Sequence, residues 1–176
     1  GRPVRVTMTQ KEARFRTPKF SRETLAAALG LRPSDIDSDL PIECVSTGIF
    51  NLMVPLRGKP TLKRIHMNMR ALFHVLNGNS TMAYCFALGG RGKAFARGML
   101  PWEIFEDPAT GSAGGSLGAY LVRHNKLKAG EHLSITQGVE MGRPSEIYVE
   151  VGNERGKLVP RVSGSAVRIF EGHIDF

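Results

Sequence analysis

The stretch TGSAGGSLGAYLVRH, residues 110–124, limits the possible folds of this chain more than any other segment. Thr110, Gly111 and Ser112 are suited to the start of a helix, and an apolar run continues it. Further glycines stand at 114, 115 and 118, and each costs an exposed helix about 1 kcal/mol relative to alanine. We therefore predict a central helix over about 111–124 with strands packed closely around it. A loop that uses glycine only for turns is the alternative.

The segment just before this helix, Glu106-Asp107-Pro108, is predicted to be extended. Pro108 fixes its own φ and biases the preceding residue away from the helical region. A helix that begins near Gly111 leaves about four amide N–H groups without intrahelical partners, and its dipole places roughly half a positive charge there. Such an end binds carboxylate or phosphate.

Three polar side chains near this helix end each allow two interpretations. Asp107 can cap the helix or hold a proton for catalysis, and the sequence favours neither. Ser112 can cap the first turn or donate to a substrate. We expect Glu106 to be a solvated or strand-end acid.

Strand patterns dominate both sides of this segment. Residues 3–9 alternate apolar and polar side chains as a half-buried strand does. Few helices intervene, so a parallel doubly wound sheet is disfavoured, and we predict one α+β domain over 1–176 with a mostly antiparallel, barrel-like sheet. The other expected strand regions are 42–56 (two strands or one bent strand), 80–88, 93–100, 132–138, 145–152 and 157–176, the last as two strands around 163–165.

Two outer helices are expected. Residues 21–31 have Ser21 as an N-cap and a glycine at the C-terminal end. Residues 61–76 repeat apolar side chains at spacings of three and four, and Asn77-Gly78 ends the pattern. We expect His66 and His74 to lie on the surface of this helix rather than to bind a metal.

Composition excludes several classes of protein. No run of about 18 apolar residues is present, so no membrane-spanning segment is expected, and the first residues lack the core of a signal peptide. Cys44 and Cys85 lack metal-site spacing, so we expect buried, reduced thiols in a cytoplasmic protein without metal. The basic residues behind the net charge of +8 are scattered, which favours a solvated surface over nucleic-acid binding.

The segment EDPATGSA, residues 106–113, resembles the signature of the PhzF-like isomerases of phenazine biosynthesis, which share the fold of diaminopimelate epimerase. Residues 45–56, 137–151 and 164–172 resemble further family segments in the same order and spacing. The resemblance covers nearly the whole chain. Family members have two similar halves with the active site between them, and this chain resembles the C-terminal half, with residues 1–20 as a lead-in strand region.

The resemblance implies a function and a set of site residues. Asp107, Gly111 and Ser112 would face the cleft and bind a small carboxylate substrate, with Thr110 beside them and Asp107 assisting proton movement. Arg143 would contact an anionic ligand, or its segment is simply a hairpin turn. Epimerases of this fold use two cysteines, whereas Ser112 stands at the corresponding place here, so proton transfer by one base, without a cofactor, is implied.

The resemblance also implies a partner. The family's glutamate base and its glycine-histidine loop belong to the N-terminal half and have no match here. Catalysis therefore requires that half, from the same protein or a separate chain, and a homodimer is a further option. The alternative function is a non-catalytic anion-binding or scaffold protein that retains the fold.

Overall fold

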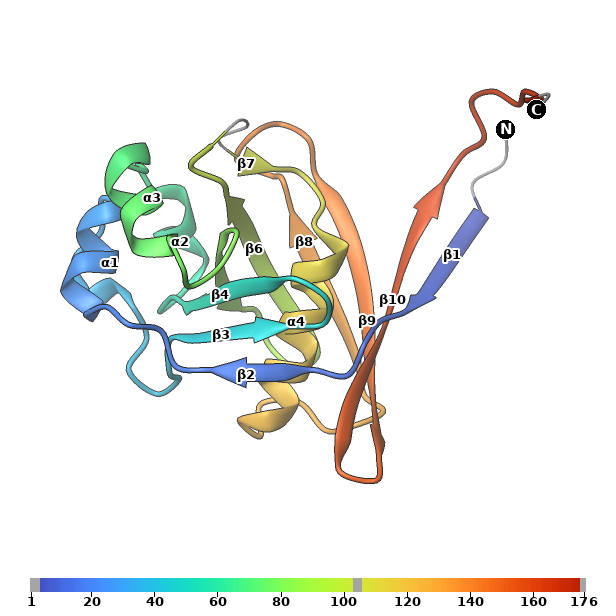
Figure 1. The fold of residues 1–176 in the computed structure, drawn as a ribbon, viewed down its shortest axis with the longest axis horizontal. Helices are drawn as coiled ribbons and strands as arrows, with labels where there is room; N and C mark the ends of the chain where they lie inside the picture. The colour runs from blue at the N-terminus through green and yellow to red at the C-terminus, as the bar shows by residue number, and fades with distance from the viewer. Residues whose placement is uncertain (1–3, 103–105, 175–176) are drawn as a thin grey trace.

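A computed structural model describes residues 4–102 and 106–174. Its strands form one curled sheet in the order β1-β10-β9-β8-β6-β5-β4-β3-β2, with β7 paired to β6 (Figure 1). The strands are β1 (Val4–Thr9), β2 (Arg14–Arg16), β3 (Glu43–Ser46), β4 (Phe50–Pro55), β5 (Ala83–Leu88), β6 (Lys93–Met99), β7 (Glu106–Asp107), β8 (His132–Gln137), β9 (Ser145–Glu154) and β10 (Lys157–Ala166). The helices are α1 (Arg22–Ala28), α2 (Lys59–Lys63), α3 (Met69–Leu76) and α4 (Gly111–Arg123), with a short 3-10 helix at Pro33–Asp35.

The central helix predicted from the glycine pattern is α4, and the sheet curls around it (Figure 1). Residues 113–121 of α4 are all buried. A Cβ on Gly114 would lie 3.0 Å from Ile147 Cγ2, and one on Gly118 would lie 2.6 Å from Val149 Cγ1. The side chains of β9 therefore occupy the space that larger residues on α4 would need.

The sheet is mixed but mostly antiparallel, as predicted. Its parallel neighbours are β4 with β5 and β6 with β8. Parallel strands need a crossover of a dozen or more residues. The segment with α2 and α3 connects the first pair, and the segment with β7 and α4 connects the second. The second crossover passes through the concave side of the sheet, which places α4 there.

Side chains of the sheet alternate between two hydrophobic cores. Cys44, Leu52 and Cys85 face the layer of α1, α2 and α3. Val45 and Met53 face α4 on the other side. The helix layer and α4 therefore lie on opposite faces of the same strands.

The first outer helix is confirmed as α1, with Ser21 accepting a hydrogen bond from the Thr24 amide. The second, predicted over 61–76, is present as two shorter helices, α2 and α3. The Asn68 side chain accepts from the Ala71 amide and begins a new helix. The amides of His66 and Asn68 donate to carbonyls at the end of α1 instead of continuing α2. Two side chains counted in its apolar pattern, Met69 and Phe73, are 37% and 43% exposed.

The two ends of the described chain form an arm, which we define as β1 and residues 162–174, and which projects from the body (Figure 1). The prediction of a half-buried first strand was wrong in one respect: β1 is a strand, but Val6 and Met8 on it are each 57% exposed. The predicted break at 163–165 is also absent, because β10 runs unbroken to Ala166 and pairs with β1. Residues 1–3 and 175–176, at the ends of the predicted first and last strands, lie outside the described residues.

Candidate functional site

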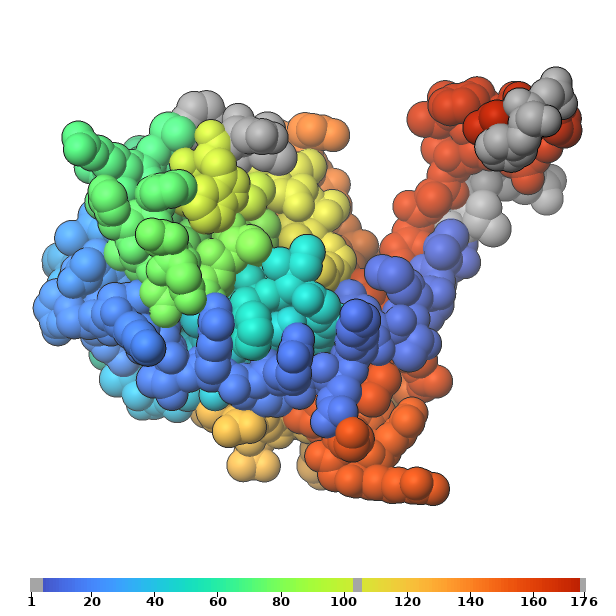
Figure 2. Space-filling model, viewed as in Figure 1, coloured from blue at the N-terminus to red at the C-terminus, as the bar shows by residue number. Residues whose placement is uncertain are grey.

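The N-terminus of α4 opens on a hollow of about 480 Å³ beside the arm. The first intrahelical bond joins the Gly114 amide to the Thr110 carbonyl at 2.9 Å, so the amides of residues 111–113 precede the helical ladder. Gly111 and Ala109 line the hollow from one side, and β9 and the arm line it from the other. Figure 2 shows this notch between the yellow segment that contains the start of α4 and the arm. The geometry presents a positively polarised helix end to a space that can hold a small molecule.

Asp107 holds the turn that leads into this helix. It is half-buried at the end of β7. Its Oδ1 accepts from the Ala109 amide at 3.2 Å, and its Oδ2 accepts from the Thr110 hydroxyl at 2.8 Å. These bonds form a turn before the helix and not a cap, because neither comes from an amide of residues 111–113, so the capping role expected for Asp107 is not observed. Its catalytic role stays a prediction.

A buried glutamine, Gln137, ties the turn together, and the sequence analysis missed it. Its Nε2 donates to the Asp107 carbonyl at 2.6 Å and to the Thr110 hydroxyl at 2.9 Å. Its Oε1 accepts from the Thr110 amide at 3.2 Å and from the Tyr84 hydroxyl at 2.8 Å. Burial raises the pKa of Tyr84 far above its usual value, so this hydroxyl stays a donor. All four hydrogen-bonding positions of the Gln137 amide are used, three of them on Asp107 and Thr110 and the fourth on Tyr84.

The strand that carries Asp107 is held to the body by an ion pair. Arg97 Nε and Nη2 donate to the two oxygens of Glu106 at 3.0 and 2.6 Å, and the two side chains are only 12% and 9% exposed. Arg97 Nη1 also donates to the Leu62 carbonyl at 2.8 Å. Of the two settings expected for Glu106, the strand end is confirmed and the solvated acid is wrong. Such a paired geometry is directional, so it helps to hold β7 beside β6, the strand that carries Arg97.

Of the predicted site residues, only Gly111 lines the hollow; Asp107, Thr110, Ser112 and Arg143 do not. Ser112 is half-buried in the first turn of α4, and its carbonyl accepts from the Thr47 hydroxyl at 3.3 Å. Arg143 is exposed in the turn between β8 and β9, where its amide donates to the Gly138 carbonyl at 2.9 Å. It does not line the hollow, whereas its neighbour Ser145 does. The hairpin turn is therefore present, and ligand binding by Arg143 stays a prediction.

Two further polar residues of β9 belong to the site. The Ser145 hydroxyl donates to the Pro108 carbonyl at 2.6 Å, which joins β9 to the turn before α4. Glu146 is also among the residues that line the hollow. It accepts from the hydroxyls of Ser134 and Thr136 at 2.7 and 2.6 Å. In sequence, both residues lie within the segment 137–151 that resembles the family, but neither was singled out as a site residue.

The two cysteines take no part in this site. Cys44 and Cys85 are buried in the core that faces α1 and α3. Burial raises the pKa of the Cys85 thiol to about 12. Within residues 4–102 and 106–174, no group of three or more His, Cys, Asp or Glu side chains is placed to hold a metal ion. No helix in the same part of the chain is long and apolar enough to cross a membrane.

The match to a family model covers almost the entire chain. Residues 3–172 match the model of the PhzC-PhzF family, described as phenazine biosynthesis-like proteins. The chain belongs to this family. Among curated PhzC-PhzF relatives, a trans-2,3-dihydro-3-hydroxyanthranilate isomerase of Pseudomonas aeruginosa is 39% identical over 158 residues. An uncharacterised isomerase of Escherichia coli K12 is 32% identical over 181 residues. These alignments cover 87% and 94% of this chain but 53% and 59% of the relatives.

Solved structures agree with the assignment to the PhzC-PhzF family. A phenazine biosynthesis protein of the PhzF family from Bacillus anthracis has a TM-score of 0.84 and 27% identity, covering 97% of this chain and 61% of that one. A predicted epimerase of P. aeruginosa has a TM-score of 0.71, also at 27% identity. A probable proline racemase of Agrobacterium radiobacter, 14% identical with a TM-score of 0.59, shares the fold. The fold is the diaminopimelate epimerase-like α+β fold, and the chain spans little more than half the length of these proteins.

Proposed function

We propose that this chain is the C-terminal half of a PhzF-like isomerase or epimerase that acts on a small carboxylate metabolite by proton transfer, without a cofactor. The observation that supports the proposal is the N-terminus of α4, where Gly111 lines a hollow. The P. aeruginosa relative is an isomerase of a substituted anthranilate, which is a carboxylate. The positive end of a helix suits that group.

The residues of this chain would bind and orient the substrate. Its carboxylate would accept hydrogen bonds from the amides of Gly111 and Ser112, and the Ser112 hydroxyl would donate a further one. Each oxygen of Asp107 accepts one hydrogen bond in the structure and has a second acceptor position, from which it would hold or pass on a proton. The general base would come from the N-terminal half.

We further propose that the N-terminal half packs on the arm and closes the hollow. The arm carries apolar side chains that are unusually exposed for a folded protein: Val6 and Met8 at 57%, Ile169 at 88% and Phe170 at 87%. Contiguous exposed apolar surface of this kind marks an interface. The relatives are nearly twice as long as the matched region, so they contain a segment of suitable size.

The test uses the complete polypeptide, or the two halves together, with trans-2,3-dihydro-3-hydroxyanthranilate as the first substrate. Proton NMR in D₂O would follow both product formation and solvent deuterium uptake. We expect Asp107→Asn with Ser112→Ala to lower kcat/KM at least about 100-fold, with the Tm within a few degrees of wild type. The matched control is Asp39→Asn with Ser38→Ala, two exposed residues that do not line the hollow, which should retain turnover. Retained turnover in the site variant would remove the assignment, and loss of the fold would favour a purely structural role.

A non-catalytic anion-binding protein is the second candidate. It is favoured by the geometry of Asp107, whose two oxygens are already engaged in holding the turn. This function predicts that the complete protein binds a carboxylate at the hollow while no deuterium enters any of a panel of carboxylate substrates. Deuterium uptake that depends on Asp107 would exclude it.

A further inference from the structure

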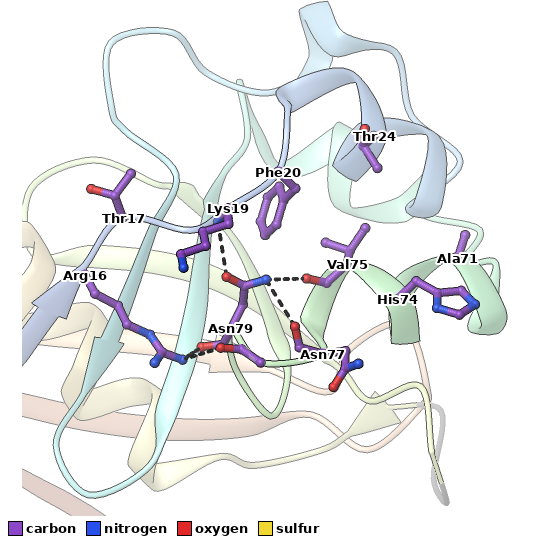
Figure 3. A pocket seen from close by; sticks show the side chains of 11 residues that line it. Arg16, Thr17, Lys19, Phe20, Thr24, Ala71, His74, Val75, Asn77 and Asn79 are labelled. Atoms are coloured by element: carbon purple, nitrogen blue, oxygen red, sulfur yellow. Dashed lines mark hydrogen bonds between the residues drawn. The ribbon is translucent and has the colours of Figure 1, made fainter.

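A second hollow, of about 620 Å³, lies in the helix layer on the face of the sheet opposite α4. We call it the outer pocket and define it by Arg16, Lys19, Phe20, Ala71, His74 and Asn79, which are among its lining residues. It is formed where the segment after β2 meets α1, α3 and the turn that follows α3 (Figure 3). The residues of the α4 site do not contribute to it.

Hydrogen bonds fix the walls of the outer pocket. The Asn79 side chain accepts from the Lys19 amide at 3.1 Å and donates to the Val75 carbonyl at 2.9 Å (Figure 3). Arg16 Nη2 donates to the carbonyls of Gly78 and Asn79. These contacts join segments about sixty residues apart in sequence. The pocket is therefore formed before any ligand arrives, which lowers the entropic cost of binding.

The lining combines an apolar floor with a cationic rim. Phe20 and Ala71 are partly buried against the core of the helix layer, and Val75 belongs to that core. Arg16, Lys19 and His74 stand at the rim and are exposed. The lining contains no Asp or Glu. A molecule that fits here needs both an apolar body and a negative charge.

The rim cations Arg16 and Lys19 differ in their partners from several arginines of the body. Arg32, Arg64 and Arg97 each pair with a carboxylate. Among the described residues, Arg16 and Lys19 form no such pair; Arg16 instead contacts main-chain carbonyls and lies 4.0 Å from the centre of the Phe50 ring. Their charges are therefore not neutralised locally, and the pocket attracts anions.

We propose that the outer pocket binds a small organic anion in which a carboxylate is attached to an aromatic or similarly apolar body. The ring lies on Phe20, Ala71 and Val75, and the carboxylate faces Lys19 and Arg16. The volume is in the range of small-molecule sites. The binding site is separate from the α4 site, so it stands whether or not the chain takes part in catalysis.

The test titrates the ¹⁵N-labelled chain with benzoate at low ionic strength, and with benzyl alcohol and acetate as probes that lack the charge or the ring. We expect benzoate to shift amide resonances of residues 16–20 and 71–79, and to bind at least about fivefold more tightly than either control. Lys19→Gln should weaken benzoate binding about three- to fivefold, as expected for one exposed charge. The matched variant Lys126→Gln, an exposed lysine outside the pocket, should leave it unchanged. Ala71→Phe, with its Tm checked, should fill the floor and weaken binding at least tenfold.

Several results would overturn the proposal. Absence of shifts in 16–20 and 71–79 at tens of millimolar benzoate would do so, as would an equal loss of affinity in Lys19→Gln and Lys126→Gln. Shifts confined to 109–115 would show that benzoate binds at α4 instead. Concentration-dependent self-association that Ala71→Phe abolishes would assign the pocket to a second copy of the chain.

Discussion

The closest approach between α4 and the sheet, at Gly118, gives a prediction with a definite sign. A Cβ there would lie 2.6 Å from Val149 Cγ1 and 3.0 Å from Val151 Cγ2. Both valines are buried, at 1% and 0% exposure, on a strand where β-branched side chains have little freedom to rotate. Overpacking of this kind costs about 1–3 kcal/mol, while alanine gains up to about 1 kcal/mol in helix propensity. We expect Gly118→Ala to lower the free energy of unfolding by about 1–2 kcal/mol.

Two other glycines of α4, Gly111 and Gly114, provide matched controls on the same helix. A Cβ on Gly114 would lie 3.0 Å from Ile147 Cγ2, and one on Gly111 would lie 3.8 Å from Val162 Cγ1, which is ordinary contact. The expected order of stability is therefore Gly111→Ala at or above wild type, then Gly114→Ala, then Gly118→Ala. Urea unfolding followed by circular dichroism at 25 °C measures all three variants.

A second variant tests whether the contact between a Cβ at 118 and Val149 causes the loss of stability. Val149→Ala removes the methyl groups that a Cβ at 118 would meet, at a cost of about 2 kcal/mol on its own. In Gly118→Ala/Val149→Ala the two losses should overlap, with a coupling energy of about 1–2 kcal/mol. Additive losses, or a Gly118→Ala protein at least as stable as wild type, would refute the packing explanation of the glycines.

Three further predictions concern buried polar groups. Gln137→Leu leaves the buried groups that now bond to the Gln137 amide without partners. Urea unfolding should therefore show a free energy of unfolding lower by about 3 kcal/mol. A decrease below about 1 kcal/mol would contradict the stabilising role of this hydrogen-bond network. The Arg64 guanidinium, together with a main-chain amide, holds the pKa of Asp35 well below its usual range. The stability that Asp35 contributes is therefore present above about pH 4 and is lost as the pH falls toward the lowered pKa. We expect the Tm of Asp35→Asn to be roughly 3–5 °C below that of wild type at pH 7, and this difference should shrink by pH 2.5. A difference in Tm that stays constant with pH would refute this. Because burial raises the pKa of Cys85 to about 12, this thiol should not react with a thiol reagent at pH 8 until the protein is unfolded; rapid labelling of the native protein would contradict its burial.

The parts of the fold that the sequence predicted are those in which one local property decides the outcome. Repeated glycines in a segment that otherwise favours a helix indicate close packing against a neighbouring element, and α4 is packed in this way. The Ser21 cap likewise marked the start of α1 correctly. The split between α2 and α3 depends instead on the end of α1, whose carbonyls take the amides of residues 66 and 68. No periodicity within 61–76 contains that information.

In the candidate site, too, the sequence predicted the local features and missed the long-range contacts. The helix end at Gly111 follows from local rules, because proline, capping residues and glycine stand side by side. The residues that hold it in place come from elsewhere: Gln137 is 27 residues from Thr110, and Arg97 is nine from Glu106. The alternation of β8 places Gln137 on the buried face with Leu133 and Ile135, so its inward direction follows from the sequence. Its partners do not follow, because they lie on β5, on β7 and in the turn before α4, and the sequence does not reveal the long-range pairing, such as that of β6 with β8, that brings them together.

The packing of α4 against the sheet also affects the position of the amides at its N-terminus. A change that strains this packing should therefore affect the proposed activity as well as the stability. At Gly118 a new Cβ must move by roughly 0.8 Å to reach ordinary contact, which begins near 3.4 Å. Gly118 lies about two turns, or roughly 10 Å, from Gly111, and a helix enclosed by strands shifts as a rigid unit. The amides at Gly111 would then move while Asp107 and Thr110 stay bound to Gln137. If the proposed function holds, Gly118→Ala should lower kcat/KM more than its loss of stability accounts for. Adding Val149→Ala to this variant should restore part of the activity. Unchanged kcat/KM in folded Gly118→Ala protein would show that this packing does not position the helix end.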